Sequence, residues 1–164
     1  MPERAFNVLF LCTHNSARSI LAEALLNSIG KGRFRAFSAG STPGGTPNPL
    51  TIETLHQEQV STEGLRSKGW DEFAQEGAPV MDLVITVCDD AAGEVCPVWP
   101  GRPVTAHWSI EDPSRFRAND AGKRRKFAEV TGILKRRIRL LADLPLGTME
   151  RHALENKVRE IGQA

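Results

Sequence analysis

Runs of apolar residues divide this chain into alternating strands and helices. Four short stretches are almost continuously apolar, which is typical of strands buried on both faces of a parallel sheet. Other segments repeat apolar residues at helical spacing, and glycine and proline mark the loops between them. The pattern predicts strands at 6–11, 34–39, 82–87 and 104–107, helices at 16–29, 50–58, 120–143 and 148–161, and a weaker short helix at 67–76.

The order of these elements predicts the fold class. A β-α-β-α-β-α alternation favours an open, parallel, doubly wound sheet. A length of 164 residues suits one domain with one core. We therefore expect a single-domain α/β fold with a four-stranded parallel sheet flanked by helices. Ligands of such folds bind beyond the carboxyl ends of the strands.

The loop after the first strand is the strongest candidate for a binding site. Cys12 ends the strand, five residues follow, and Arg18 opens a helical pattern. A loop that wraps into a helix start points backbone N–H groups at one spot, and the helix dipole adds positive charge there. The planar fork of an arginine suits a tetrahedral oxyanion. The expected oxyanion-binding residues are Thr13, His14, Asn15, Ser16, Ala17, Arg18 and Ser19.

The same electrostatic field would act on Cys12. A free thiol has a pKa of about 8.5, and a helix N-terminus beside a cation lowers it to roughly 3.5–7.5, so Cys12 is a candidate nucleophile. We expect Asn15 to accept left-handed backbone geometry, Ser16 to cap the helix, and Ser19 to donate its hydroxyl to the sulfur. The alternative is that Cys12 is a small buried hydrophobic residue.

Two further cysteines follow the third strand. If the first and third strands are neighbours, Cys88 faces the same crevice as Cys12. An unbroken helix would separate the Cα atoms of Cys88 and Cys96 by about 12 Å, whereas a disulfide needs about 5.5 Å. Pairing therefore requires an irregular or unwound segment. We expect a redox relay; the alternative is a buried Cys88 and an incidental Cys96.

Asp112 is the candidate general acid. It follows the fourth strand, so its carboxyl group can overhang the crevice and protonate an oxygen that leaves the central atom of the anion. Asp-Pro is also an ordinary turn signal, which is the alternative. Glu111 is a less favoured acid. We expect His107 and Trp108 to pack and fix this loop, and His14 to tune the field or the entrance of the anion site.

Composition excludes several classes of partner. The net charge is +1, and the basic runs at 123–126 and 135–137 alternate with the apolar stripe of the long helix. We therefore expect a solvated helix face and no nucleic-acid partner. No apolar stretch is long enough to cross a bilayer, so we expect no membrane partner. No Cys/His cluster has zinc spacing, and we expect no bound metal.

The three cysteines also indicate a compartment. They are too few for a disulfide scaffold, and the N-terminus shows no signal-peptide pattern. Both observations favour a reducing cytoplasm, in which the thiols remain available for chemistry.

The motifs taken together resemble a known family. Segment 12–19 (CTHNSARS) resembles the anion loop of low-molecular-weight protein tyrosine phosphatases, which the arsenate reductases built on the same fold share. Three features favour the reductases. Segment 86–88 (TVC) with Cys96 resembles their relay pair, and segment 107–113 (HWSIEDP) resembles their acid loop. Ser114 stands where the phosphatases carry aromatic residues that hold phosphotyrosine.

The resemblance implies a flavodoxin-like, phosphatase-like fold and the reduction of arsenate to arsenite. By that resemblance, Cys12 attacks arsenic, Asp112 supplies the proton, and Cys88 and Cys96 end as a disulfide. No cofactor is bound; an external thiol reduces the disulfide, either thioredoxin, another thiol–disulfide protein or a small thiol. The resemblance covers roughly residues 6–140, so we expect a catalytic domain at 1–143. Residues 144–164 would form a helical extension on or beside it.

Two alternatives remain open from the sequence. A phosphatase would need Cys12, Arg18 and Asp112 but neither other cysteine, and would hydrolyse phosphomonoesters through a cysteinyl-phosphate. A non-catalytic oxyanion-binding module would need only Arg18 and the loop backbone.

Overall fold

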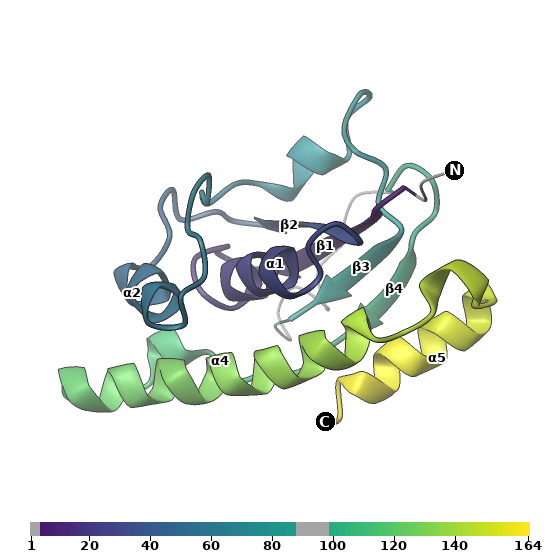
Figure 1. Cartoon of the computed structure of the whole chain (residues 1–164). Coiled ribbons are helices and arrows are strands. Elements are labelled where there is room, and N and C mark those ends of the chain that lie inside the picture. The colour runs from purple at the N-terminus through teal and green to yellow at the C-terminus, as the bar shows by residue number, and fades with distance from the viewer. Residues whose placement is uncertain (1–3, 88–98) are drawn as a thin grey trace.

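The computed structural model describes residues 4–87 and 99–164 (Figure 1). Cys88 and Cys96, with the relay expected between them, lie outside the described residues. The strands are β1 (Phe6–Cys12), β2 (Phe34–Gly40), β3 (Leu83–Thr86) and β4 (Val104–His107). The α-helices are α1 (Arg18–Ile29), α2 (Pro49–Gln57), α4 (Asp120–Ala142) and α5 (Arg151–Ile161), and the short 3-10 helices are η1 (Trp70–Phe73), η2 (Pro113–Arg115) and η3 (Leu146–Thr148).

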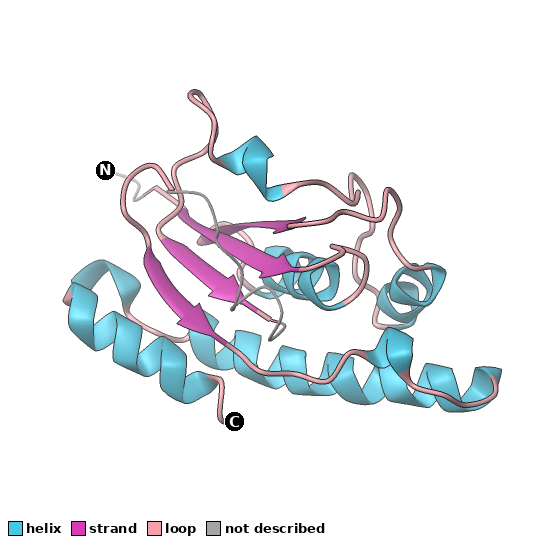
Figure 2. Ribbon diagram, turned by 180° about the vertical axis from the view of Figure 1, so that it is seen from behind, coloured by secondary structure: helices cyan, strands magenta, loops and turns pink. Residues whose placement is uncertain are grey.

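The four strands form one parallel sheet in the order β2-β1-β3-β4. Their arrowheads point the same way in Figure 2. This arrangement confirms the predicted α/β class and the expected adjacency of the first and third strands. Because the strands are parallel, β1 and β4 deliver the residues that follow them to the same edge of the sheet.

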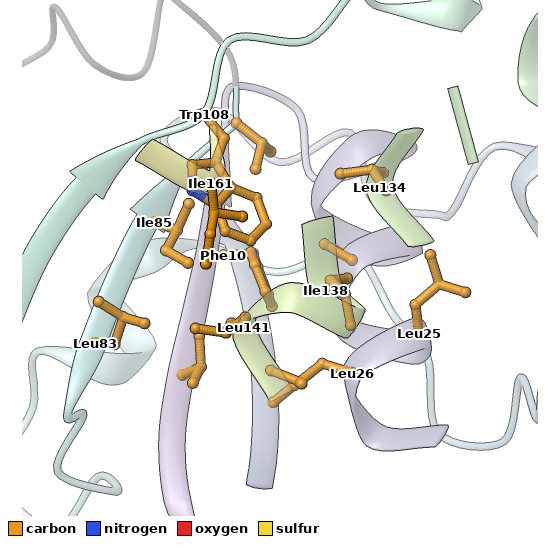
Figure 3. Close-up of a cluster of buried hydrophobic side chains, with 14 of the residues drawn as sticks. Phe10, Leu25, Leu26, Leu83, Ile85, Trp108, Leu134, Ile138, Leu141 and Ile161 are labelled. Atoms are coloured by element: carbon orange, nitrogen blue, oxygen red, sulfur yellow. The ribbon is translucent and has the colours of Figure 1, made fainter. Parts of the chain in front are cut away.

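β1 is buried on both faces, as its continuous apolar run predicts. Val8 and Phe10 point into a core that α1, α4 and α5 cover. Leu9 and Leu11 point into a second, smaller cluster on the opposite face. In the larger core the rings of Phe10 and Trp108 lie with their centroids 6.0 Å apart (Figure 3). Burying each such side chain contributes about 1.5–3 kcal/mol.

The smaller cluster includes a segment whose helix is shorter than the sequence pattern predicts. The weak helix expected at 67–76 is only the four-residue turn η1, whose Trp70 and Phe73 cover Leu9 and Leu11. The preceding backbone is extended, because the carbonyl of Lys68 accepts the N–H of Gly40 and Gly69 bridges to the end of β2. That pairing holds the first residues of the expected helix outside helical geometry.

The long helix α4 carries its predicted stripe, with Phe127, Val130, Leu134, Ile138 and Leu141 all buried. α5 then packs against β4, the edge strand. The indole N–H of Trp108 donates to the carbonyl of Val158 in α5 at 2.8 Å. Among residues 4–87 and 99–164, no helix combines the length and apolar character needed to cross a bilayer.

Candidate active site at the carboxyl edge of the sheet

The loop after β1 folds tightly around the end of that strand. Cys12 is the last residue of β1 and is buried. Asn15 has a φ of 49° and is fully buried, which confirms its expected left-handed geometry. Gly40, at the end of β2, allows the close approach, because a Cβ there would lie 2.5 Å from the carbonyl oxygen of Thr13. The backbone of two adjacent strands therefore shapes this loop.

Two polar groups converge on the sulfur of Cys12. The backbone N–H of Asn15 donates to Sγ at 3.2 Å. The hydroxyl oxygen of Ser19, in the first turn of α1, lies 2.7 Å from the same sulfur. The expected contact between Ser19 and Cys12 is thus confirmed. Hydrogen-bond donors directed at a sulfur favour its charged form.

The start of α1 differs from the prediction. The helix begins at Arg18, and its N-cap is Ala17, with no side-chain capping hydrogen bond. The expected cap by Ser16 is wrong, because the carbonyl of Ser16 instead accepts the N–H of Asn48 and the hydroxyl of Thr51, which ties the chain there to α2. N–H groups of an uncapped first turn lack a side-chain acceptor and can bind an anion.

Arg18 and Asp112 meet beside this loop, although 94 positions separate them in the sequence. An Nη atom of Arg18 lies 3.4 Å from Oδ2 of Asp112, and both side chains are largely buried. Arg18 also donates to the carbonyl of Ile110 at 3.0 Å. Oδ1 of Asp112 accepts the N–H and the hydroxyl of Ser114, so Asp112 also caps the turn η2. Asp112 is therefore both a turn residue and a neighbour of the anion loop.

The accessory residues occupy distinct positions. Glu111 pairs with Lys126 on α4 at 2.9 Å. The ring of His14 is exposed and lies 3.2 Å from the carbonyl of Thr42. The ring of His107 contacts the hydroxyl of Thr86 at 2.7 Å, and Trp108 is fully buried. The expected packing of Trp108 is confirmed.

The family model of the low molecular weight phosphotyrosine protein phosphatases matches residues 7–159. The chain belongs to this family. Within it, the arsenate reductase of Halalkalibacterium halodurans is 31% identical over 136 residues, which is 83% of this chain and 94% of that relative. The arsenate reductase of Bacillus subtilis is 29% identical over the same shares of both chains.

Solved structures agree with this family assignment. The arsenate reductase of Archaeoglobus fulgidus superposes with a TM-score of 0.62 at 29% identity, covering 84% of this chain and 99% of that one. A thioredoxin-dependent arsenate reductase of Corynebacterium glutamicum gives 0.57 at 26% identity, covering 82% of this chain and 61% of that one. The predicted resemblance to arsenate reductases of the phosphatase family is confirmed.

In this family member, the sequence pattern missed a buried polar network beneath the anion loop. The ammonium of Lys68 lies 3.4 Å from a carboxylate oxygen of Glu23, and both side chains are almost fully buried. The hydroxyl of Ser38 donates to the same carboxylate at 2.6 Å. One signal was available: Glu23 lies four residues after Ser19, hence on the same face of α1. The contribution of Lys68 comes from a distant loop and had no local signal.

Metal ligands do not gather in the described part of this family member. Across residues 4–87 and 99–164, no group of three or more His, Cys, Asp or Glu side chains is arranged to hold a metal ion. The described groups around the anion loop include N–H donors, the guanidinium of Arg18, the carboxyl group of Asp112 and the thiol of Cys12. That combination suits an oxyanion and a nucleophilic attack on its central atom.

Proposed function

We propose that this chain reduces arsenate to arsenite, with Cys12 as the nucleophile. Two lines support the proposal. The relatives named above are arsenate reductases that this chain covers almost completely or in large part. The carboxyl edge of the sheet also brings a thiol, a guanidinium and a carboxyl group together around a loop of N–H donors.

The first step is substitution at arsenic. Arsenate sits in the loop, held by backbone N–H groups and by Arg18. The thiolate of Cys12 forms a bond to arsenic, and an oxygen leaves as Asp112 donates its proton to that oxygen. Asp112 already lies within 3.4 Å of Arg18, so a proton donor and an anion clamp flank the same space.

The second step transfers two electrons to arsenic. The thiol of Cys88 attacks the sulfur of Cys12, a disulfide forms between them, and the electron pair of the sulfur–arsenic bond leaves with arsenite. Cys96 then attacks the sulfur of Cys88, which frees Cys12 and leaves a disulfide between Cys88 and Cys96. An external dithiol, which we expect to be thioredoxin, reduces that disulfide. This cycle needs a reducing compartment, and we expect the cytoplasm.

One observation carries the proposal most directly. The sulfur of Cys12 accepts the N–H of Asn15 and lies 2.7 Å from the hydroxyl of Ser19. A structural cysteine in an apolar core has no need of such partners. Donors of this kind at a helix N-terminus are what a reactive thiolate requires.

The test is an assay of arsenate-dependent consumption of reducing equivalents, with thioredoxin and its reductase as the electron source. Wild type is compared with Cys12→Ser, Cys88→Ser and Cys96→Ser. We expect all three variants to lose turnover. Full turnover in both Cys88→Ser and Cys96→Ser contradicts the relay, whereas full turnover in Cys12→Ser contradicts the assignment of the nucleophile.

The same variants separate the competing functions. Phosphomonoester hydrolysis that needs Cys12, without any arsenate reduction, would identify a phosphatase. Oxyanion binding that none of the three substitutions affects, with no turnover of either kind, would identify a binding module. The reductase proposal predicts only slow ester hydrolysis, retained in the Cys88 and Cys96 variants.

A further inference from the structure

A continuous chain of hydrogen bonds links the buried pair of Lys68 and Glu23 to the sulfur of Cys12. It starts at the ammonium of Lys68, which also donates to the carbonyl of Arg66 at 3.0 Å. It passes through residues on α1, on β2 and in the anion loop. In order, the links are Lys68 to Glu23 (3.4 Å), Glu23 to Ser38 (2.6 Å), Ser38 to Asn15 (2.9 Å), Asn15 to Ser19 (2.8 Å) and Ser19 to Cys12 (2.7 Å).

The donors and acceptors of the Asn15 side chain fix which group donates in each of these hydrogen bonds. The carbonyl oxygen of the Asn15 side chain accepts the backbone N–H of Lys68, at 2.8 Å, and that group can only donate. The amide nitrogen of Asn15 therefore faces both hydroxyls and donates one hydrogen to Ser38 and one to Ser19. Each hydroxyl keeps a single proton to donate.

The two remaining protons then have one acceptor each. Ser38 donates to the carboxylate of Glu23. Among the described residues, the other partner of the Ser19 oxygen is the sulfur of Cys12. Cys12 thus receives a hydrogen from Ser19 and another from the backbone of Asn15, which is the pattern that a thiolate requires.

The positive charge of Lys68 balances the negative charge of Glu23. Without a neighbouring cation, the buried carboxylate of Glu23 would oppose a second negative charge on Cys12. Lys68 and Glu23 are buried side by side, with 8% and 12% of their side chains exposed, so solvent screens this pair only weakly. The ammonium neutralises the carboxylate while leaving it an acceptor for Ser38.

We propose that Lys68 is a positioning residue for Cys12: its ammonium compensates Glu23, so that the chain through Ser38, Asn15 and Ser19 holds the sulfur as a thiolate. The inference rests on the proposed role of Cys12 as nucleophile. It concerns the ionisation of that thiol, which can be measured with no arsenate present.

Other charged groups face this network and must be held constant. Arg66 acts electrostatically on Glu23 from the same loop as Lys68, and it is itself paired with Glu72. Arg18 and Asp112 form the other charged pair beside the anion loop. None of these groups is changed in the variants below, so a difference between variants reports the pair of Lys68 and Glu23.

The test is a double-mutant cycle read by alkylation. Cys12 is alkylated with iodoacetamide across a range of pH, and the peptide that contains Cys12 is quantified by mass spectrometry. We expect Lys68→Met to raise the pH midpoint and to slow alkylation about three- to tenfold at a pH below it. Glu23→Gln should lower the midpoint, because it leaves the ammonium uncompensated. The double variant should return close to wild type.

The double-mutant cycle distinguishes an effect of charge on the alkylation midpoint from an effect of lost packing. If the double variant alkylates as slowly as Lys68→Met, lost packing explains the effect and the proposal is overturned. If Lys68→Met does not fold, the downward shift in Glu23→Gln remains the test, and its absence overturns the proposal. Ser19→Ala, which removes the last link, should raise the midpoint in either case.

Lys31→Met is the matched control. Lys31 is exposed and lines the same surface pocket as Glu23, so its removal changes the net charge equally without entering the network. We expect its midpoint to equal that of wild type. A shift as large as that of Lys68→Met would show a general effect of net charge and would contradict the proposal.

Chemical rescue provides a second readout. Glu23 lines a surface pocket, so we expect a small amine added to Lys68→Ala to reach its carboxylate. Methylammonium chloride should restore a lower midpoint in that variant, whereas tetramethylammonium chloride at the same concentration, being too bulky to reach the carboxylate, should not. Equal effects of the two salts would count against a specific role of the ammonium.

Discussion

An arginine and an aspartate pair at each end of the sheet, and the two pairs differ in geometry. At the amino end, Arg4 donates two hydrogen bonds to Asp82, at 2.6 and 2.8 Å, and the N–H of Asn7 donates a third at 2.8 Å. At the carboxyl end, Arg18 meets Asp112 through a single contact of 3.4 Å. The first pair is a closed, bidentate ion pair, and the second is loose.

The difference indicates what each end does. The bidentate pair uses the parallel donors of Arg4 fully and ties the start of β1 to the start of β3. Arg18 is instead held by the carbonyl of Ile110 and meets the carboxyl group of Asp112 only at Oδ2. That oxygen also lies 3.6 Å from Arg115, so the carboxyl group is not closed into one bidentate pair. The amino end therefore serves stability, and the carboxyl end retains polar groups for a ligand.

The largest predicted effect is on chemistry at the carboxyl end. Asp112→Asn removes the proton donor, so we expect arsenate turnover to fall about 10²- to 10⁴-fold. Affinity for inorganic phosphate should change little, because the amide keeps the shape of the side chain. Steady-state turnover and calorimetric titration with phosphate measure the two quantities. A turnover within twofold of wild type would remove Asp112 from the mechanism.

The next effect concerns the two arginines. Arg18→Gln removes the charged fork, and we expect affinity for inorganic phosphate to fall about 100-fold, which is about 2.7 kcal/mol. Arg4→Gln is the matched control, because it removes the same side chain from the other end. We expect it to leave phosphate binding unchanged. Equal losses in both variants would mean that net charge, and not the site, governs binding.

A smaller effect should follow a change in the shape of the loop. Gly40→Ala places a methyl group 2.5 Å from the carbonyl oxygen of Thr13, so the loop must shift, at a cost of about 1–3 kcal/mol. Gly44→Ala is the control, since its methyl group would lie 3.9 Å from the carbonyl oxygen of His14, an ordinary van der Waals contact. Urea unfolding should separate the variants, and phosphate affinity should fall only in Gly40→Ala.

The smallest effect lies at the amino end and depends on pH. Burial alone would raise the pKa of Asp82, but hydrogen bonds from Arg4 and from the N–H of Asn7 outweigh burial and lower it. A carboxyl group with a lowered pKa stabilises the fold above its unfolded pKa of about 3.9, and this contribution is lost as the pH falls through the lower folded value.

Asp82→Asn should therefore destabilise the protein by about 1 kcal/mol at pH 7 and by less near pH 3. Urea unfolding at both values measures the difference. Arsenate turnover of the folded variant should equal that of wild type, the reverse of the pattern expected for Asp112→Asn. A destabilisation that grows on acidification would contradict the assigned role of Asp82.

Local patterns predicted most of the fold. The apolar runs identified all four strands of the described sheet, and the stripe from Phe127 to Leu141 identified the long helix. The left-handed backbone of Asn15 was also predictable, because asparagine tolerates it and the turn from β1 into α1 demands it. These features depend on neighbouring residues, which is why the sequence shows them.

The features that the sequence did not predict correctly depend on contacts between distant segments. Ser16 looked like a helix cap, but its carbonyl is bound to the start of α2. Lys68 belongs to a loop without regular structure, yet its backbone N–H donates to Asn15 in the loop after β1 and its ammonium pairs with Glu23 on α1. No spacing along the chain reveals such a pairing, because tertiary packing alone brings the two loops together.

The central claim is that the carboxyl edge holds Cys12 as a thiolate beside an oxyanion site. Its most direct test is the rate of Cys12 alkylation by iodoacetamide across pH, with and without inorganic phosphate. The account predicts a midpoint at least one unit below the ordinary thiol value of about 8.5, and protection by phosphate. A midpoint near 8.5, or a rate that phosphate leaves unchanged, would contradict it.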